Sequence, residues 1–248
     1  PIYLEDPDLQ DARARWPFVC IWDNHEFAWA GYQSQYVAGG GYSAPAQNQK
    51  ISANQAWWEF MPAMVQQPGN PKLEHFNAPA VVDTPLGKFN EDGLSEEPNN
   101  LKAINSLKIQ RVLRWGKNVD LLLTDNWSFR SPDMSTNDFD VPEYPRVFAQ
   151  LPFEIMDYGR HYNGDKPPET IKFNGKDIPN PTKNVHAQTY LGSAQRDWFL
   201  KQLGASTAPW KIWGHGFGTM EVRSDYQNLP GELGAKWPKD VGYAVMDN

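Results

Sequence analysis

Four polar residues stand in a row directly after an apolar run in this sequence. Asp23, Asn24, His25 and Glu26 follow residues 18–22. Asp and Asn offer hard oxygen ligands and His offers a borderline nitrogen ligand, which together form the ligand set of a hydrolytic metal centre. A histidine beside metal ligands is also able to protonate a leaving oxygen or to stabilise an oxyanion. A capped turn with a structural histidine explains these residues about equally well, because Asp and Asn stabilise turns locally.

Two later apolar runs also lead into polar residues. Residues 119–124 precede Asp125 and Asn126, and residues 210–213 precede His215. Short apolar runs of this kind predict buried strands, and the one over residues 18–22 is expected to be buried on both faces. Open α/β sheets bind ligands outside the carboxyl ends of their strands. The three strand ends together therefore predict one site, although the sequence leaves their mutual distances open.

Helices are expected between these strands. Apolar residues on one helical face predict a helix over Leu191–Leu203, with Gly204 as its stop. Further helices are expected over Pro7–Arg15 and over Ile51–Val65, the second with Asn54 as a possible cap. Strands that alternate with helices predict an α/β fold with right-handed crossover connections.

Long segments rich in Gly, Pro, Asn and Asp predict loops. They cover residues 31–50, 66–100 and 131–185, together with the C-terminal segment after residue 218. Residues 108–115 form either a strand that pairs with the next one or the end of a helix. No linker interrupts this pattern, so one domain is expected.

The composition excludes several classes of protein. The chain has 248 residues and a net charge of −7, which argues against a nucleic-acid-binding surface. No stretch approaches the roughly 18 apolar residues of a transmembrane segment. Cys20 is the only cysteine, which excludes an internal disulfide framework and a zinc ribbon. The 11 scattered tryptophans are expected to pack in the core and loops more often than to form a sugar-stacking surface.

The sequence FVCIWDNHE at residues 18–26 resembles the strand and turn of the PhoD-type alkaline phosphatase/phosphodiesterase family, whose motif is WDDHE. Three later segments resemble blocks of that family in the same order. Residues 111–130 match R-x-x-x-W-G…L-x-L-L-D-x-R-x-x-R, residues 191–203 match L-G-x-x-Q-x-x-W…L, and residues 206–214 match S-x-A-x-W-K-x-x-G. The loops between these blocks are unmatched.

This family belongs to the calcineurin-like metallophosphoesterases. The resemblance therefore implies a β-sandwich flanked by helices, with a multi-metal site at the strand ends. It also implies hydrolysis of phosphate mono- or diesters by a metal-activated hydroxide. Iron and calcium are the usual metals, and some relatives act as phospholipase D.

The resemblance assigns roles to single residues. It places Asp23 and Asn24 at the metals, and it gives His25 the part of stabilising the developing phosphoryl charge or of helping the leaving group. Glu26 is expected to orient the turn rather than to bind metal. His215 stands where other metallophosphoesterases carry a Gly-His ligand pair, but PhoD-type sequences usually have another polar residue there.

The sequence also departs from the family pattern. Asn24 replaces the second Asp of the motif, and Trp127 stands where the family often has Arg. The metal-binding blocks G-D-x-x-Y and G-D-x-H are not found. Residues 1–248 are therefore expected to be the central portion of the catalytic domain, with other polypeptide segments completing the active site. Arg130 is a candidate for binding phosphate, but a structural ion pair is at least as good an explanation.

The beginning of the chain and the family bear on location. The chain starts at Pro1 without a Met or an apolar targeting segment, as expected for a removed leader or an internal piece of a longer protein. The resemblance implies a periplasmic or extracellular protein that acts on a phosphate ester.

Other functions stay open at this point. A non-catalytic binding module would use its aromatic loops to stack rings or sugars. An inactive fragment would bind metal poorly, because affinity follows the number and geometry of the ligands. A glycosidase needs a pair of carboxylates, and no such pair stands out here. Metal content separates the phosphoesterase from the binding module.

Overall fold

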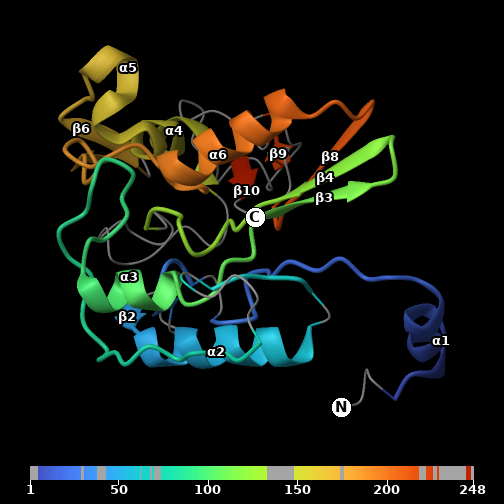
Figure 1. Ribbon diagram of the computed structural model, residues 1–248. Coiled ribbons are helices and arrows are strands. Elements are labelled where there is room, and N and C mark those ends of the chain that lie inside the picture. Colours follow the sequence, from blue (N-terminus) through green and yellow to red (C-terminus); the bar gives the residue numbers. More distant parts are fainter. Residues whose placement is uncertain are drawn as a thin grey trace.

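Short helices and small sheets make up an α/β architecture. The computed structural model describes residues 5–28, 31–37, 43–61, 63–67, 69, 74–132, 148–173, 176–217, 222–225, 228 and 244–246. Figure 1 shows helices α2 and α3 side by side in one part of the molecule, and a twisted sheet beside α6 in another. The two-sheet sandwich that the resemblance implies stays a prediction.

The helices and strands have the following bounds. The helices are α1 (Pro7–Arg15), α2 (Gln47–Phe60), α3 (Pro98–Ile104), α4 (Gln150–Tyr158), α5 (Tyr162–Asp165) and α6 (Gly192–Ala205), with a 3₁₀ turn at Gly159–His161. The strands are β1 (Gln35–Val37), β2 (Ser43–Pro45), β3 (Arg111–Trp115), β4 (Val119–Leu123), β5 (Phe148–Ala149), β6 (Thr170–Phe173), β7 (Lys176–Pro179), β8 (Trp210–Gly214), β9 (Val222–Ser224) and β10 (Ala244–Met246).

The sheet that carries the candidate site has the order β3-β4-β8. β3 and β4 are antiparallel and turn at Gly116, whose φ of +58° suits a residue without a Cβ. β4 and β8 are parallel, with Leu122 opposite Trp213. A parallel pair needs a crossover connection, and α6 lies on it. The strands predicted over residues 119–124 and 210–213 are confirmed, and residues 108–115 take the strand alternative.

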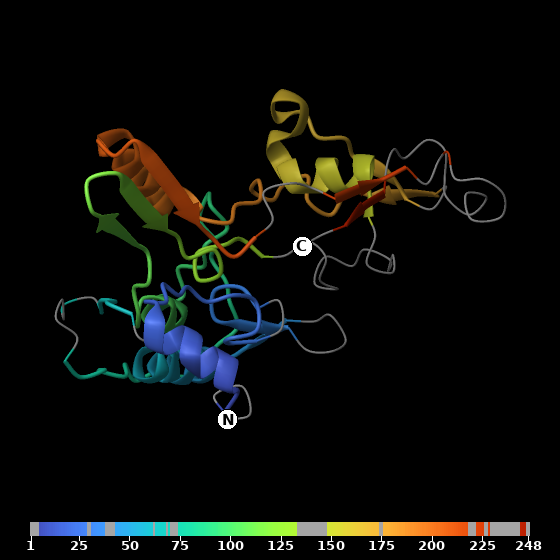
Figure 2. The same cartoon turned by 90° about the vertical axis from the view of Figure 1, so that its right-hand side faces the viewer.

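Helix α6 covers one face of this sheet, as Figure 2 shows. Phe199 of α6 packs on Trp213 of β8 with ring centroids 4.9 Å apart. The predicted helix over residues 191–203 is therefore present and faces the sheet. It continues through Gly204 to Ala205, so this glycine is not its stop.

Helix α2 packs through a buried stripe. Lys50, Asn54 and Trp57 recur every three or four residues, and Ile51 lies next to Lys50, so all four share one face. Asn54 donates from Nδ2 to the hydroxyl of Ser106 over 2.7 Å, which gives the amide nitrogen a partner inside the interface beside α3. The main hydrophobic cluster beside this stripe contains Trp22, Trp57, Val65, Leu107, Ile109 and Trp127. Three tryptophans thus pack in the core, as the sequence predicts.

Helix α1 matches its predicted bounds, whereas α2 does not. α2 starts four residues earlier than predicted, because Asp83 accepts a hydrogen bond from the backbone N–H of Asn48 over 2.9 Å. This cap comes from a distant segment, so local sequence does not reveal it. Asn54 lies within the buried face of the helix and is not its cap.

The strand predicted over residues 18–22 is wrong. Among the described residues this segment is extended but pairs with no strand, and Phe18 and Val19 are 40 % and 44 % exposed. Arg111 donates from Nη2 to the carbonyl oxygen of Cys20 over 2.8 Å. A side chain therefore satisfies a backbone group that a strand partner would otherwise bind.

The segments predicted as loops contain more structure than expected. Residues 31–50 include the β1–β2 hairpin and the start of α2, and the described part of residues 131–185 includes α4, α5, β6 and β7. Ile155, Met156 and Ile171 form a second small core there, which stabilises helix and hairpin together. The described part of residues 66–97 holds only isolated bridges and matches the prediction, but α3 begins at Pro98 within the predicted loop, and β9 and β10 lie in the C-terminal segment.

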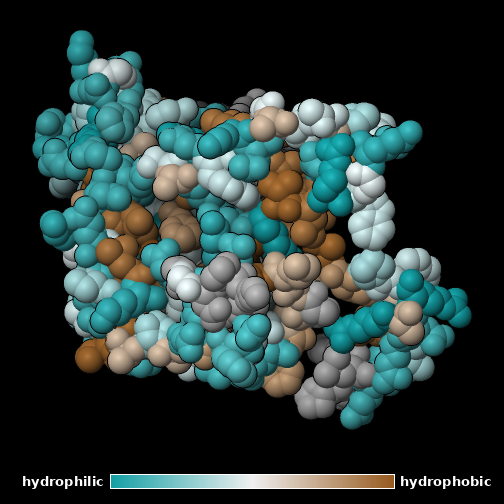
Figure 3. All heavy atoms as spheres, viewed as in Figure 1, coloured by the Kyte–Doolittle hydropathy of each residue, from teal (hydrophilic) through white to brown (hydrophobic). Residues whose placement is uncertain are grey.

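Hydrophilic side chains cover most of the surface in Figure 3, with apolar patches between them. None of the helices in the described residues is long and apolar enough to cross a membrane.

Candidate functional site

The segment before the Asp-Asn-His-Glu turn meets the end of β4 through one hydrogen bond. The indole Nε1 of Trp22 donates to Oδ1 of Asp125 over 2.8 Å, and both residues are buried. A hydrogen bond to a buried carboxylate is stronger than one between neutral groups. The ends of the first two predicted strands therefore lie side by side, although the first is not a strand.

Asp125 is an anchor for the backbone around it. Its Oδ1 also accepts the backbone N–H groups of Trp127 over 3.0 Å and Ser128 over 2.9 Å. Gln195 of α6 accepts from the backbone N–H of Asp125 and donates to its carbonyl oxygen, both over 2.7 Å. These bonds tie the end of β4 to α6. Oδ2 of Asp125 accepts no hydrogen bond from the described part of the chain.

The segment after β8 reaches the same place. A methyl group on the α-carbon of Gly216 would lie 3.2 Å from Oδ1 of Asp23 and 3.3 Å from Nε1 of Trp127. His215 stacks on Trp213 with ring centroids 4.3 Å apart, and its Nδ1 accepts the backbone N–H of Phe217 over 3.3 Å. His215 thus shapes the turn that brings Gly216 beside Asp23.

The Asp-Asn-His-Glu turn is closed by its own last residue. Oε2 of Glu26 accepts the backbone N–H of Asp23 over 2.7 Å. Asp23 and His25 are exposed, whereas Asn24 is half-buried. The turn therefore exposes the side chains of Asp23, His25 and Glu26, and Glu26 also holds the backbone of the turn.

A small cavity of about 10 Å³ lies beneath this turn, which is roughly the space of one water molecule. Asp23, Asn24, Glu26 and Trp127 line it together with Lys50 of α2. Two oxygen-bearing side chains predicted as metal ligands thus share one cavity. A water molecule or a monatomic ion matches its size.

Lys50 is a buried cation that the sequence reasoning missed. Its side chain is 2 % exposed, and its ammonium lies 4.1 Å from the ring centroid of Trp22 and 5.2 Å from that of Phe27. Burial lowers the pKa of Lys50 to about 8, although the nearby carboxylates of Asp125 and Glu26 oppose this shift. A lysine in a helix normally predicts an exposed position, so the sequence carries no signal for this one.

Arg130 lies beside the same cluster of rings. Its guanidinium carbon is 5.0 Å from the ring centroid of Trp127, 5.3 Å from that of Tyr190 and 5.7 Å from that of Phe217. The residue is 6 % exposed, and its carbonyl oxygen accepts from Nε2 of Gln33 over 3.0 Å. The aromatic faces therefore hold a buried positive charge next to Trp127.

The described residues hold only part of a metal-binding set. No group of three His, Cys, Asp or Glu side chains suited to a metal ion occurs among them. Asp23 and Asn24 offer oxygen donors of the right kind at one cavity, but two such donors fall short of the ligand number of a hydrolytic metal. A metal ion here needs further ligands, and the described residues supply no step that passes through one.

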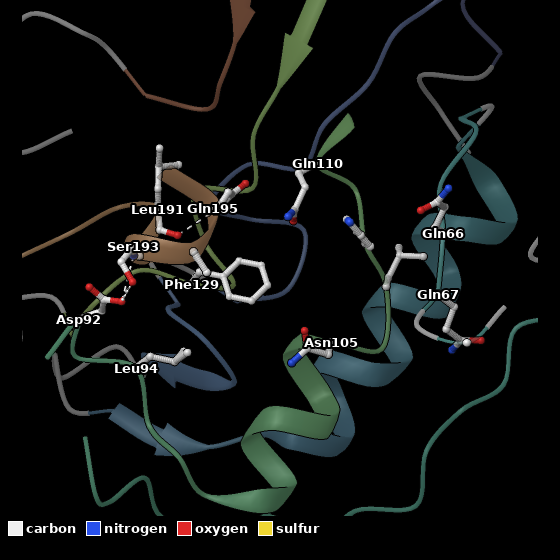
Figure 4. A pocket seen from close by; sticks show the side chains of 15 residues that line it. Gln66, Gln67, Asp92, Leu94, Asn105, Gln110, Phe129, Leu191, Ser193 and Gln195 are labelled. Carbon is white, nitrogen blue, oxygen red and sulfur yellow. Dashed lines mark hydrogen bonds between the residues drawn. The ribbon is translucent and has the colours of Figure 1, made fainter. Parts of the chain in front are cut away.

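A larger cavity of about 470 Å³ lies near the start of α6. Figure 4 shows mainly amide and apolar side chains around it, among them Gln66, Gln110 and Gln195. Its carboxylate, Asp92, accepts hydrogen bonds from the backbone N–H and the hydroxyl of Ser193 over 2.9 Å and 2.6 Å. This carboxylate is already engaged at the helix start, and Lys108 is the other charged side chain in the lining.

Three chain segments, each ending in polar residues, thus converge on Asp23 in an α/β fold. Ligands of open α/β sheets bind at such strand ends. The model of the PhoD-like phosphatase family matches residues 1–245, and the chain belongs to this family. Comparisons with curated proteins and with solved structures give no match. Membership places the chain among the phosphatases and makes a phosphate ester its class of substrate.

Proposed function

We propose that this protein hydrolyses phosphate mono- or diesters with the help of metal ions at the Asp-Asn-His-Glu turn. Asp23 and Asn24 would hold the metal together with further ligands from another polypeptide segment, because two oxygen donors alone are too few for a hydrolytic metal. Residues 1–248 would then be the central portion of one catalytic domain. The observation that carries the proposal is the convergence of the turn, the end of β4 and Gly216 around Asp23.

Each residue of the turn has a separate part in this proposal. Bound metal ions would supply Lewis-acid activation of water and of the phosphoryl group. His25, which is exposed at the turn, would donate a proton to the leaving oxygen or stabilise the developing charge on the phosphoryl oxygens. Glu26 keeps the turn closed through the backbone of Asp23. Arg130 would add positive charge beside the site without leaving its aromatic surroundings.

The identity of the metals, the location and the partners are part of the same proposal. Iron and calcium are the metals we propose, with Asn24 as a neutral ligand where the family motif has a carboxylate. The protein would act in the periplasm or outside the cell. Phospholipase D-like cleavage of a lipid phosphodiester is one reaction within this class.

The protein isolated in its native form tests the proposal. Intact mass under denaturing conditions would identify any co-purifying polypeptide, and metal analysis of the same sample would give the metal content. We expect further polypeptide sequence together with stoichiometric iron or calcium, and release of phosphate or alcohol from simple phosphate esters. Asn24→Ala is expected to lower both metal content and activity. A preparation without metal that cleaves no phosphate ester would contradict the proposal.

A further inference from the structure

Trp127 carries a buried hydrogen-bond donor that the structure leaves without an acceptor. The residue is 7 % exposed, and its indole Nε1 donates to no group in the described part of the chain. An unpaired buried donor costs about 1–3 kcal/mol, so buried indole N–H groups usually find a partner. The surroundings of Nε1 should therefore contain an acceptor that comes within reach in the working protein.

The carboxylate of Asp23 is one candidate acceptor, and the carbonyl oxygen of Trp22 is another. A methyl group on the α-carbon of Gly216 would lie 3.3 Å from Nε1 of Trp127, 3.2 Å from Oδ1 of Asp23 and 3.5 Å from the carbonyl oxygen of Trp22. Trp127 and Asp23 also line the same small cavity. The indole N–H and the carboxylate thus both lie beside the place where any other residue at position 216 would carry a side chain.

The two side chains differ in their freedom to move. The indole of Trp127 is held between Phe217, at 4.8 Å between ring centroids, and the guanidinium of Arg130. Asp23 is exposed, and its backbone N–H donates to Oε2 of Glu26, which leaves its carboxylate outside that bond. A rotation of the exposed Asp23 carboxylate would therefore offer the indole an acceptor without moving the core.

We propose that the indole N–H of Trp127 donates a hydrogen bond to the carboxylate of Asp23 and thereby sets the direction of its other oxygen. Trp127 is then a positioning residue, and Gly216 is the spacer that lets the two side chains approach. The consequence for catalysis rests on the proposed function of Asp23 as a metal ligand. Hydrogen bonds to a ligating carboxylate orient it and tune its affinity for the metal.

The indole resonances in a ¹H–¹⁵N spectrum of the metal-free protein test the hydrogen bond itself. Trp127→Phe identifies the resonance of Trp127 by its disappearance. Asp23→Ala, which keeps the indole in place, is expected to move that resonance upfield and to speed its exchange with solvent. An unchanged resonance in Asp23→Ala would overturn the inference, because the acceptor would then be the carbonyl oxygen of Trp22 or a water molecule.

A second measurement keeps the test independent of how well Trp127→Phe folds. Gly216→Ala places a methyl group against both partners and is expected to shift the same resonance as Asp23→Ala. If the two variants perturb different indole resonances, the proposed geometry is wrong. Neither result depends on enzymatic activity.

Metal binding and kinetics connect the hydrogen bond to function. Titration of the protein with Ca²⁺ is expected to show about 10- to 100-fold weaker binding in Trp127→Phe, and kcat for a phosphate ester should fall while KM changes little. Trp115→Phe, an exposed residue at the far end of β3, is the control and should change neither quantity. Unchanged Ca²⁺ affinity in Trp127→Phe would overturn the positioning role. If neither the wild-type protein nor any variant cleaves a phosphate ester, the proposed function is contradicted. The indole spectrum still shows whether the hydrogen bond between Trp127 and Asp23 exists.

Discussion

The indole of Trp22 and the carboxylate of Asp125 join two segments that are 103 residues apart in the sequence, through a buried hydrogen bond of 2.8 Å. The bond fixes the start of the Asp-Asn-His-Glu turn against the end of β4. Because the same carboxylate oxygen also binds two backbone N–H groups, the positions of the turn and of the chain after β4 depend on one atom.

Asp125→Ala should therefore be strongly destabilising. It leaves the indole N–H of Trp22 and two backbone N–H groups without their acceptor in a buried place. We expect the free energy of unfolding to fall by about 3–5 kcal/mol, measured by urea denaturation. Asp177→Ala on the exposed β7 strand is the matched control and should stay within about 0.5 kcal/mol of the wild type. Similar losses in both variants would contradict the anchoring role of Asp125.

Lys50→Met should change how stability depends on pH. Burial lowers the pKa of Lys50 to about 8 in the folded protein, below the usual value of 10.5. Between these two values the unfolded chain binds more protons than the folded one, so stability rises with pH. The rise amounts to about 3 kcal/mol for this shift. Urea denaturation at several pH values should show this rise in the wild type and in the exposed control Lys117→Met, but not in Lys50→Met.

Gly93→Ala should destabilise the region around His186. Gly93 has a φ of +67°, and a methyl group there would lie 2.0 Å from Cε1 of His186. We expect a loss of about 2–4 kcal/mol in the free energy of unfolding, since backbone strain and overpacking act together. Gly116→Ala is the control, because Gly116 has a similar φ of +58° but open space around it. Its cost should be limited to about 1–2 kcal/mol of strain. Equal losses in the free energy of unfolding for the two variants would show that the His186 ring moves aside without a measurable penalty.

His186 should make the fold sensitive to acid. Burial lowers the pKa of His186, helped by the charge of Arg160, while the carbonyl of Ala187 and the charge of Asp92 act in the opposite direction. As the pH falls through the ordinary value of 6.5, the unfolded chain takes up a proton that the folded chain resists, so stability is lost. The loss is at most about 1.4 kcal/mol per pH unit until the folded pKa is reached. His186→Gln should reduce this slope in thermal unfolding, whereas His75→Gln at an exposed position should not.

His25→Ala tests the acid–base part of the proposed function. Loss of a positioned proton donor should lower kcat about 10²- to 10⁴-fold for a phosphate ester with a poor leaving group. An ester whose alcohol leaves easily needs less protonation, so the loss should be smaller for it. The exposed His75→Ala serves as the control. Equal losses for both esters would argue that His25 stabilises the phosphoryl charge instead of protonating the leaving group.

Local sequence patterns predicted the elements whose cause is local. The apolar runs that end in polar residues located β4 and β8, and the polar segment over residues 7–15 was correctly expected to form α1. Long-range contacts determined the segments where the structure differs from the sequence-based prediction. Asp83 caps α2 from 35 residues away, and the guanidinium of Arg111 takes the place of a strand partner for residues 18–22.

The sequence by itself determined which chemical groups the candidate site contains. The Asp-Asn-His-Glu turn and the family blocks are patterns of residue types in a fixed order, and such patterns are visible without a structure. Only the tertiary structure decided which polar groups share that site. Lys50 belongs to a helix and Gly216 to a loop, and neither has a local pattern that marks it. They come to lie beside Asp23 because the core around Trp22 and Trp127 packs these segments together, and packing depends on all of them at once.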